Sequence, residues 1–239
     1  MRTNAVLSAA LATVIGYGIA NAIPWPGDDT GLASLDKTIS KCEIKASKNV
    51  SKLVAAILKC QTKLVDNAFK AKPPLDEQAC EATAEGTFTA KTLTADCPCV
   101  DVPGIIGIAE PVINSNANLT LCDPAGPLIA SLPDNGAVQI TGNVPSTKDI
   151  LKYENKVGKN ISKLVATYLK CHQAAQANYQ KTLTFDEPTE ESCEAAAVSA
   201  FNTAVAGLTG GQGCEDIAGV VSLTEAQLEG GNFLTFCAD

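Results

Sequence analysis

The stretch that decides the fold is KASKNVSKLVAAILKC at residues 45–60, because it recurs as KVGKNISKLVATYLKC at residues 156–171 with 11 of 16 positions identical. The cysteines that follow the two copies also match: Cys60, Cys80, Cys99 and Cys122 correspond to Cys171, Cys193, Cys214 and Cys237. A duplicated unit with matched cysteines indicates two copies of one disulfide-linked structure. It gives no indication of catalysis.

The segments around the two copies differ from them in composition. Residues 1–22 have the pattern of a secretory signal peptide, in which Arg2 precedes an apolar stretch and Ala20-Asn21-Ala22 forms a small-residue cleavage site. The other divisions that we predict are a linker at 23–34, a first repeat at 35–125, a connector rich in proline and glycine at 126–146, and a second repeat at 147–239.

Composition indicates export. All 10 cysteines lie after the signal peptide, which favours disulfides in an oxidising compartment, so we predict a secreted or periplasmic protein. No segment after residue 22 is apolar over a length that suggests a transmembrane anchor. This part of the chain has 17 lysines, no arginine and 26 acidic residues, a net charge of −9, so nucleic acid is not an expected partner. The lack of a CxxC motif and the single histidine argue against a metal site, and we predict no cofactor.

Each copy begins with a pattern that is typical of two helices in a row. Apolar residues recur at helical spacing, prolines follow these runs, and Asp76 is suited to cap the start of a helix. The helices that we expect span about 35–72, 76–95, 146–180 and 189–208. We therefore predict an all-α fold, a tandem repeat of two disulfide-stapled antiparallel helical hairpins, each followed by a short tail that a cystine closes.

The repeat suggests a disulfide pairing. Cys42 and Cys97 have no counterparts in the second copy, so we predict that they are bonded to each other. Facing residues of an antiparallel hairpin have a nearly constant sum of residue numbers, and this rule supports Cys42–Cys97 together with Cys60–Cys80. The other predicted bridges are Cys171–Cys193 in the second hairpin and Cys99–Cys122 and Cys214–Cys237 in the two tails. With this pairing, the Cys97-Pro98-Cys99 motif is structural rather than a redox-active dithiol.

A row of lysines follows the face opposite the apolar residues on the first helix of each copy. The candidate binding residues in these rows are Lys41, Lys45, Lys48, Lys52, Lys152, Lys156, Lys159 and Lys163. Such rows suit docking to an anionic polymer, an envelope surface or an acidic protein. The alternative is a solvated face that the next helix neutralises, for which the hairpin register predicts the pairs Lys59–Glu81, Lys63–Glu77 and Lys170–Glu194.

The remaining candidates for chemistry are weak. His172 occupies the position of Gln61 in the other copy, so we predict a surface histidine rather than a catalytic base. Acidic residues recur at matched positions, but most are near helix starts, where negative charge is stabilising in any case. These acids are Glu77 with Glu190, Glu81 with Glu194, Asp101 with Asp216, and Glu110 with Glu225. We assign no catalytic residue.

The segments KCEIKASKNVSKLVAAILKC and KYENKVGKNISKLVATYLKCH, each followed by CEA and a late cysteine, resemble a group of exported bacterial repeat proteins. Those proteins are rich in lysine and alanine and carry cysteines, and the resemblance implies export and repetition but no activity. The function that we expect is non-catalytic binding or a structural role through the lysine-rich faces. The alternatives are a protein that carries lipid between its hairpins and, behind these, a thiol-redox or hydrolytic enzyme.

Overall fold

The first predicted helix forms as one continuous element, α1 (Lys37–Phe69), in a computed structural model that describes residues 22–92, 99–129, 140–211 and 213–237. Its apolar face is buried, with Leu53 and Ile57 at most 2% exposed. The Asp36 carboxylate caps the helix by accepting hydrogen bonds from the backbone amides of Thr38 and Ile39, at 2.6 and 3.1 Å. The spacing of apolar residues therefore predicted this helix correctly.

The other three predicted helices are also present. They are α2 (Glu77–Thr92), α4 (Lys148–Thr182) and α5 (Glu187–Ala206). Asp76 accepts a hydrogen bond from the backbone amide of Ala79 at 2.9 Å, as its assignment as an N-cap requires. Each of these helices begins and ends within a few residues of its predicted bounds, apart from the end of α2, which adjoins residues outside the described part.

The two tails are helical, in contrast to the short tails that we predicted. They contain α3 (Val102–Ser115) and α6 (Ile217–Gly230), each followed by a short 3-10 turn at η1 (Ala117–Leu119) and η3 (Asn232–Leu234). Matched aspartates start both helices, because Asp101 accepts from the amide of Gly104 at 2.9 Å and Asp216 accepts from that of Gly219 at 2.8 Å.

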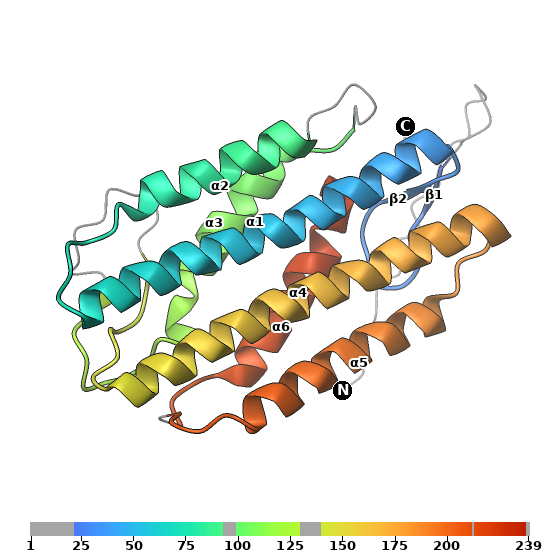
Figure 1. The fold of residues 1–239 in the computed structure, drawn as a ribbon. Coiled ribbons are helices and arrows are strands. Elements are labelled where there is room, and N and C mark those ends of the chain that lie inside the picture. Colours follow the sequence, from blue (N-terminus) through green and yellow to red (C-terminus); the bar gives the residue numbers. More distant parts are fainter. Residues whose placement is uncertain (1–21, 93–98, 130–139, 212, 238–239) are drawn as a thin grey trace, which may run out of the picture.

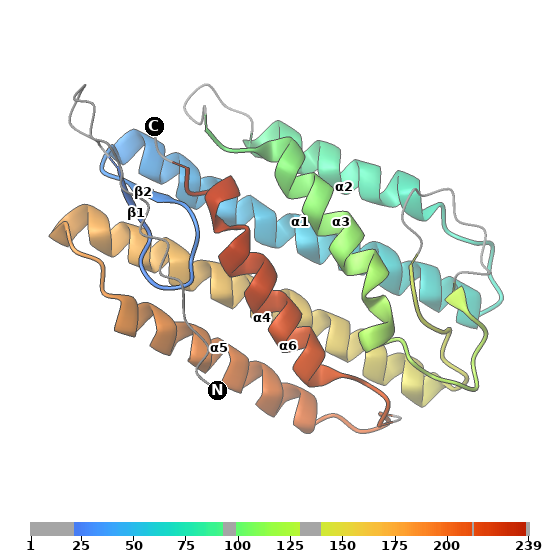
Figure 2. The same cartoon turned by 180° about the vertical axis from the view of Figure 1, so that it is seen from behind.

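The four long helices lie side by side in one layer, in the order α2, α1, α4, α5 (Figure 1). Neighbours in this layer run antiparallel. Helices α3 and α6 cover one face of the layer, as the view from behind shows (Figure 2). The main core contains residues of both sequence copies, including Leu53 and Ile105 from the first and Val165 and Leu234 from the second. The two copies therefore pack against each other over a shared core.

Residues 23–34, which we predicted to be a linker, form a packed hairpin. Strand β1 (Ala22–Pro24) pairs antiparallel with β2 (Leu32–Ser34), and Leu32 also bridges to Cys237 near the other end of the chain. Trp25 is 5% exposed and packs with Tyr179 and Phe236. The linker prediction was wrong because Trp25 lies among prolines and glycines. Such a local sequence does not show whether the fold buries the tryptophan side chain.

The connector at 126–146 also contributes to the core where it is described. Ile129, Ile140 and Val144 are each at most 4% exposed and pack with Leu64 of α1 and Leu151 of α4. A backbone bridge between Leu128 and Asn143 joins its two ends. The described ends of the connector are therefore part of the folded structure rather than a free loop.

The disulfides confirm the pairing within the hairpins and correct it in the tails. Cys60–Cys80 joins α1 to α2 and Cys171–Cys193 joins α4 to α5, as predicted. Cys99 is bonded to Cys237 instead of Cys122, and Cys122 is bonded to Cys214. The predicted bridges Cys99–Cys122 and Cys214–Cys237 are therefore wrong. Each tail is closed by a cysteine of the other copy, and two covalent links join the copies.

Two predictions concern the remaining parts of the chain. Cys42 takes part in a disulfide, but its predicted partner Cys97 lies outside the described residues. The signal peptide prediction also falls outside them, apart from Ala22, which begins β1. Among the helices of the described ranges, none combines the length and the apolar character needed to span a bilayer.

Candidate functional site

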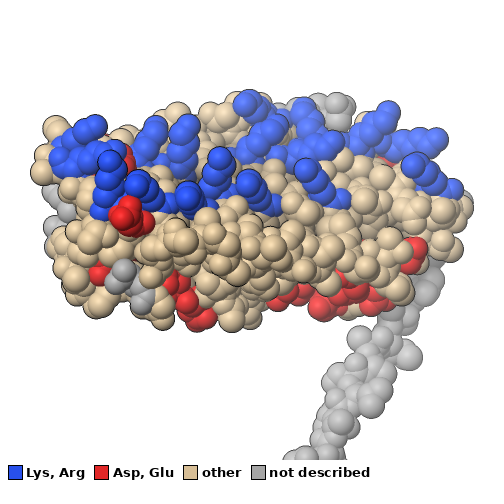
Figure 3. Space-filling model, turned by 60° about the horizontal axis from the view of Figure 1, so that its bottom comes forward, with Lys and Arg blue, Asp and Glu red and all other residues tan. Residues whose placement is uncertain are grey.

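The candidate binding lysines all project from one side of the helical layer. The eight predicted residues are exposed on α1 and α4, and the other lysines of the same rows are exposed as well. Figure 3 shows the lysines gathered along one side of the surface and most of the visible acidic residues on the other. We call this side the lysine face, and it consists of Lys41, Lys45, Lys48, Lys52, Lys59, Lys63, Lys70, Lys152, Lys156, Lys159, Lys163, Lys170 and Lys181.

The predicted neutralising ion pairs are not formed. Glu81, the expected partner of Lys59, is 1% exposed and accepts a hydrogen bond from Asn114 at 3.2 Å. Glu194, the expected partner of Lys170, is 5% exposed and lies against His172. Glu77, the expected partner of Lys63, is likewise buried and lies next to Glu81. The hairpin register was close, but these acidic side chains turn inward from the helix that carries them.

The lysine face is therefore largely uncompensated. Its ion pairs within the described ranges are Lys70–Asp66 at 2.5 Å and Lys152–Asp149 at 3.0 Å. Both are pairs within one helix at exposed positions, and such pairs contribute only about 0–1 kcal/mol. A dense row of cations on a chain of net charge −8 creates a local positive potential on an otherwise acidic molecule.

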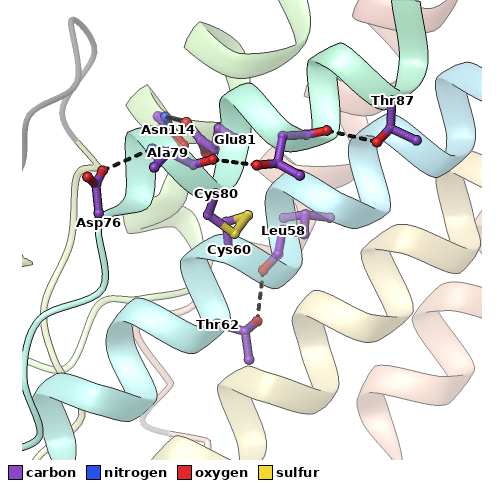
Figure 4. The surroundings of a disulfide bond; sticks show 10 residues. Leu58, Cys60, Thr62, Asp76, Ala79, Cys80, Glu81, Thr87 and Asn114 are labelled. Carbon is purple, nitrogen blue, oxygen red and sulfur yellow. Dashed lines mark hydrogen bonds between the residues drawn. A yellow bond between two sulfur atoms is a disulfide. The ribbon is translucent and has the colours of Figure 1, made fainter. Parts of the chain in front are cut away.

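The acids that turn inward form a buried polar cluster in each sequence copy. In the first copy, Gln61 donates a hydrogen bond to Asn114 at 2.7 Å, and Asn114 donates to Glu81 beside the Cys60–Cys80 bridge (Figure 4). Burial, with a smaller contribution from the neighbouring Glu77, raises the pKa of Glu81 to about 9. The Glu81 carboxyl is therefore protonated at neutral pH, which suits an apolar surrounding.

The cluster of the second copy has a different composition, because His172 stands where the first copy has Gln61. His172 is fully buried, so the prediction of a surface histidine is wrong. Its Nε2 atom lies 2.8 Å from Oε1 of Glu194 and 3.3 Å from Oδ1 of Asp29. Burial raises the pKa of Asp29 and of Glu190 to about 8, against the attraction that His172 exerts on Asp29.

Three separate elements meet in this second cluster. His172 comes from α4, Glu190 and Glu194 come from α5, and Asp29 comes from the loop between β1 and β2. One signal in the sequence could have found the α4–α5 part. The Cys171–Cys193 bridge places the residues that follow each cysteine next to each other, and these residues are His172 and Glu194. The contribution of Asp29 had no such signal.

A third feature is an apolar groove on the face opposite the lysines. Residues of α3 and α6 form its sides and residues of α1 and α4 form its floor, and its cavity volume is about 160 Å³. Matched residues of the two copies line it, among them Val54 with Val165 and Leu58 with Leu169. The groove therefore lies where the two copies meet.

Glu154 of α4 is a buried carboxyl group outside these sites, and the effect of burial on its pKa can be tested by itself. Its side chain is 4% exposed, its carboxylate oxygens accept no hydrogen bond in the described structure, and burial raises its pKa from 4.5 to about 8. The folded protein then holds a proton that the unfolded chain releases, so this group destabilises the fold as the pH rises from about 4.5 to 8. Glu154→Gln should remove that dependence, because glutamine does not ionise.

We expect the free energy of unfolding of Glu154→Gln, relative to the unmodified protein, to increase by about 2 kcal/mol between pH 5 and pH 7. The increase should stop above about pH 8. Urea titrations followed by circular dichroism at several pH values measure this difference. Asp149→Asn, an exposed carboxylate on the same helix, is the control and should leave the profile unchanged. A difference that is independent of pH would contradict the assignment.

Comparison with models of protein families, with curated proteins and with solved structures found no match to this chain.

Proposed function

We propose that this protein is an exported, non-catalytic binding protein whose lysine face docks an extended anionic polymer. The observation that carries the proposal is the accumulation of exposed lysines from both α1 and α4 on one side, while the acids expected to neutralise them, Glu77, Glu81 and Glu194, are buried. The disulfides support export, because such bonds persist in oxidising compartments. The sequence repeat supports the interpretation of the two helical hairpins as copies of one unit, each of which contributes one row of lysines.

The dimensions of the lysine face favour a polymer over a small anion. Lys41 and Lys70 are separated by 29 residues of helix, which corresponds to about 44 Å at 1.5 Å per residue. A second row of similar length runs beside it on α4. Charges repeated over such a length match a chain that carries a negative charge on each monomer, such as an acidic polysaccharide of the envelope.

The alternatives have weaker support. The apolar groove suits a lipid chain by composition, but about 160 Å³ is well below the roughly 300–1,000 Å³ of most small-molecule sites. A redox role for the Cys97-Pro98-Cys99 motif would need a reactive thiol, whereas Cys99 is bonded to Cys237. We therefore place lipid carriage second and thiol chemistry third.

The proposal predicts that binding depends on the charge of the lysine face and not on its shape. We expect the quadruple variant Lys45→Gln, Lys48→Gln, Lys156→Gln and Lys159→Gln to bind a sulfated polysaccharide at least tenfold more weakly, since a lysine near an anionic surface contributes about 1 kcal/mol. Affinity chromatography on heparin and titration with soluble polygalacturonate measure this loss, and both interactions should weaken with added salt.

The matched control changes the same four lysines to arginine, which keeps the charge at each exposed position. This control should bind as well as the unmodified protein. Equal binding by the glutamine and arginine variants would rule out the lysine face as the docking surface. Absence of binding to either polyanion at low salt would refute the proposed partner class.

A further inference from the structure

We propose a binding site for one divalent first-row transition metal ion, such as Zn²⁺, formed by His172, Asp29, Glu190 and Glu194. This site lies inside the molecule, away from the lysine face, and is independent of the proposed docking function. The sequence contains no CxxC motif and a single histidine, and carboxylates supply three of the four ligands of this site.

The geometry of the four side chains suits a metal ion. Each offers one ligand atom, and these atoms all lie within 4.8 Å of one another. Metal–ligand bonds of about 2.1 Å in a tetrahedral arrangement place ligand atoms about 3.4 Å apart. The separations of His172 Nε2 from Asp29 Oδ1, at 3.3 Å, and from Glu194 Oε1, at 2.8 Å, are close to that value. Small side-chain adjustments would therefore complete the site.

Burial provides the second argument. His172 is 0% exposed and Glu190 and Glu194 are each 5% exposed. The buried imidazole of His172 has its Nε2 atom between carboxylate oxygens of Glu194 and Asp29, and its Nδ1 atom has no hydrogen-bond partner in the described structure. Unsatisfied buried polar atoms are costly, and three carboxylates in one buried place repel each other when ionised. A divalent cation bound by Nε2 of His172 and the three carboxylates would offset the repulsion.

The donor set indicates the class of ion. An imidazole nitrogen favours Zn²⁺ and its neighbours in the first transition row over Mg²⁺ and Ca²⁺, which prefer oxygen ligands alone. Four protein ligands leave no open position in a tetrahedral site, which is the arrangement of structural rather than catalytic zinc. The ion would fasten the loop of the β1–β2 hairpin, through Asp29, to α4 and α5.

The loop that carries Asp29 is built for this close approach. Gly27 and Gly31 on either side of it have φ values of +73° and +114°, a region that favours glycine. A side chain at Gly31 would meet the backbone oxygen of Phe236 at 2.5 Å, so the loop lies tightly against the chain near the C-terminus. The first copy has Gln61 and Asn114 in its cluster instead of an imidazole, so it serves as an internal reference that should not bind the ion.

The chain contains its own reporter for this site. Trp25 is the only tryptophan, and its ring centroid lies 5.6 Å from that of His172. After overnight equilibration of the purified protein, Co²⁺ should quench Trp25 fluorescence and saturate at one ion per chain. Zn²⁺ should displace Co²⁺ and restore the fluorescence. Isothermal titration with Zn²⁺ should give the same stoichiometry.

Three variants test the assignment. His172→Gln introduces the residue of the first copy, Asp29→Asn changes only a loop ligand, and both should weaken Co²⁺ binding at least tenfold while circular dichroism confirms folding. Glu81→Gln, at the position that matches Glu194, is the control and should bind Co²⁺ as the unmodified protein does. Quenching that does not saturate, or equal Co²⁺ affinity in a folded Asp29→Asn or His172→Gln variant, would overturn the proposal and leave a hydrogen-bonded cluster only.

Discussion

Replacing Cys99 and Cys237 together by serine should lower the free energy of unfolding by about 4 kcal/mol. Their bridge spans 138 residues of sequence, but the Cys122–Cys214 bridge shortens the loop that it closes. The path from Cys99 to Cys122 and from Cys214 to Cys237 covers 23 residues on each side, so the closed loop has about 46 residues. Chain entropy assigns about 4 kcal/mol to a loop of that size. Urea titration under non-reducing conditions measures the change.

The arrangement of these two bridges can be tested separately from their energy. A protease site inserted between residues 130 and 139 allows the chain to be cut between the two sequence copies. We expect the cut protein to migrate as one species without reductant and as two fragments with it, because Cys99–Cys237 and Cys122–Cys214 each join the copies. A variant with all four cysteines changed to serine is the control and should separate in both cases. If the cut protein that keeps all its cysteines separated into two fragments without reductant, each tail would be closed within its own copy.

The helices were predictable because their signals are local. Apolar residues at helical spacing and aspartate caps lie within each element, and α1, α2, α4 and α5 follow from them. The bridges Cys60–Cys80 and Cys171–Cys193 were also predictable, because a short hairpin leaves each cysteine one facing partner. Local geometry thus determined most of the secondary structure.

The tail disulfides were not predictable, and the repeat itself explains the error. Cys99 matches Cys214, and Cys122 matches Cys237, so both observed bridges join the same two types of position that we paired. The observed bridges differ from the predicted ones only in which copy supplies the partner cysteine. Matching sequences cannot distinguish closure within a copy from exchange between copies, because the choice depends on how α3 and α6 cross the layer (Figure 2).

The two candidate sites also differ in whether the sequence could predict them. The lysine face was visible from the sequence, because its residues repeat along two helices whose outer sides were already known. The cluster around His172 was not visible, because it needs Asp29 from a segment that we predicted to be a linker. The predicted ion pairs between the lysines and the acids of the next helix were wrong for a related reason. A helical register places Glu81 and Glu194 beside the lysines, but it does not show that their carboxylates turn into the core.

Trp25→Ala should destabilise the protein by about 3–5 kcal/mol, the usual cost of removing a large aromatic side chain from a core. The ring of Trp25 is 5% exposed, and its centroid lies 4.9 Å from that of Phe236 and 5.0 Å from that of Phe185. These contacts join the N-terminal hairpin to the segment after α4 and to the end of the chain. A linker would tolerate the change, whereas a packed hairpin would not.

Ile23 is the matched control, because it lies two residues before Trp25, on β1, but is 36% exposed. Ile23→Ala should change the free energy of unfolding by less than about 1 kcal/mol. Urea titrations followed by far-ultraviolet circular dichroism measure both variants without relying on the tryptophan signal. If the two changes had equally small effects, the hairpin would contribute no packing energy. Asp29 would then be held too loosely to complete the cluster around His172, so this measurement also bears on the proposed metal site.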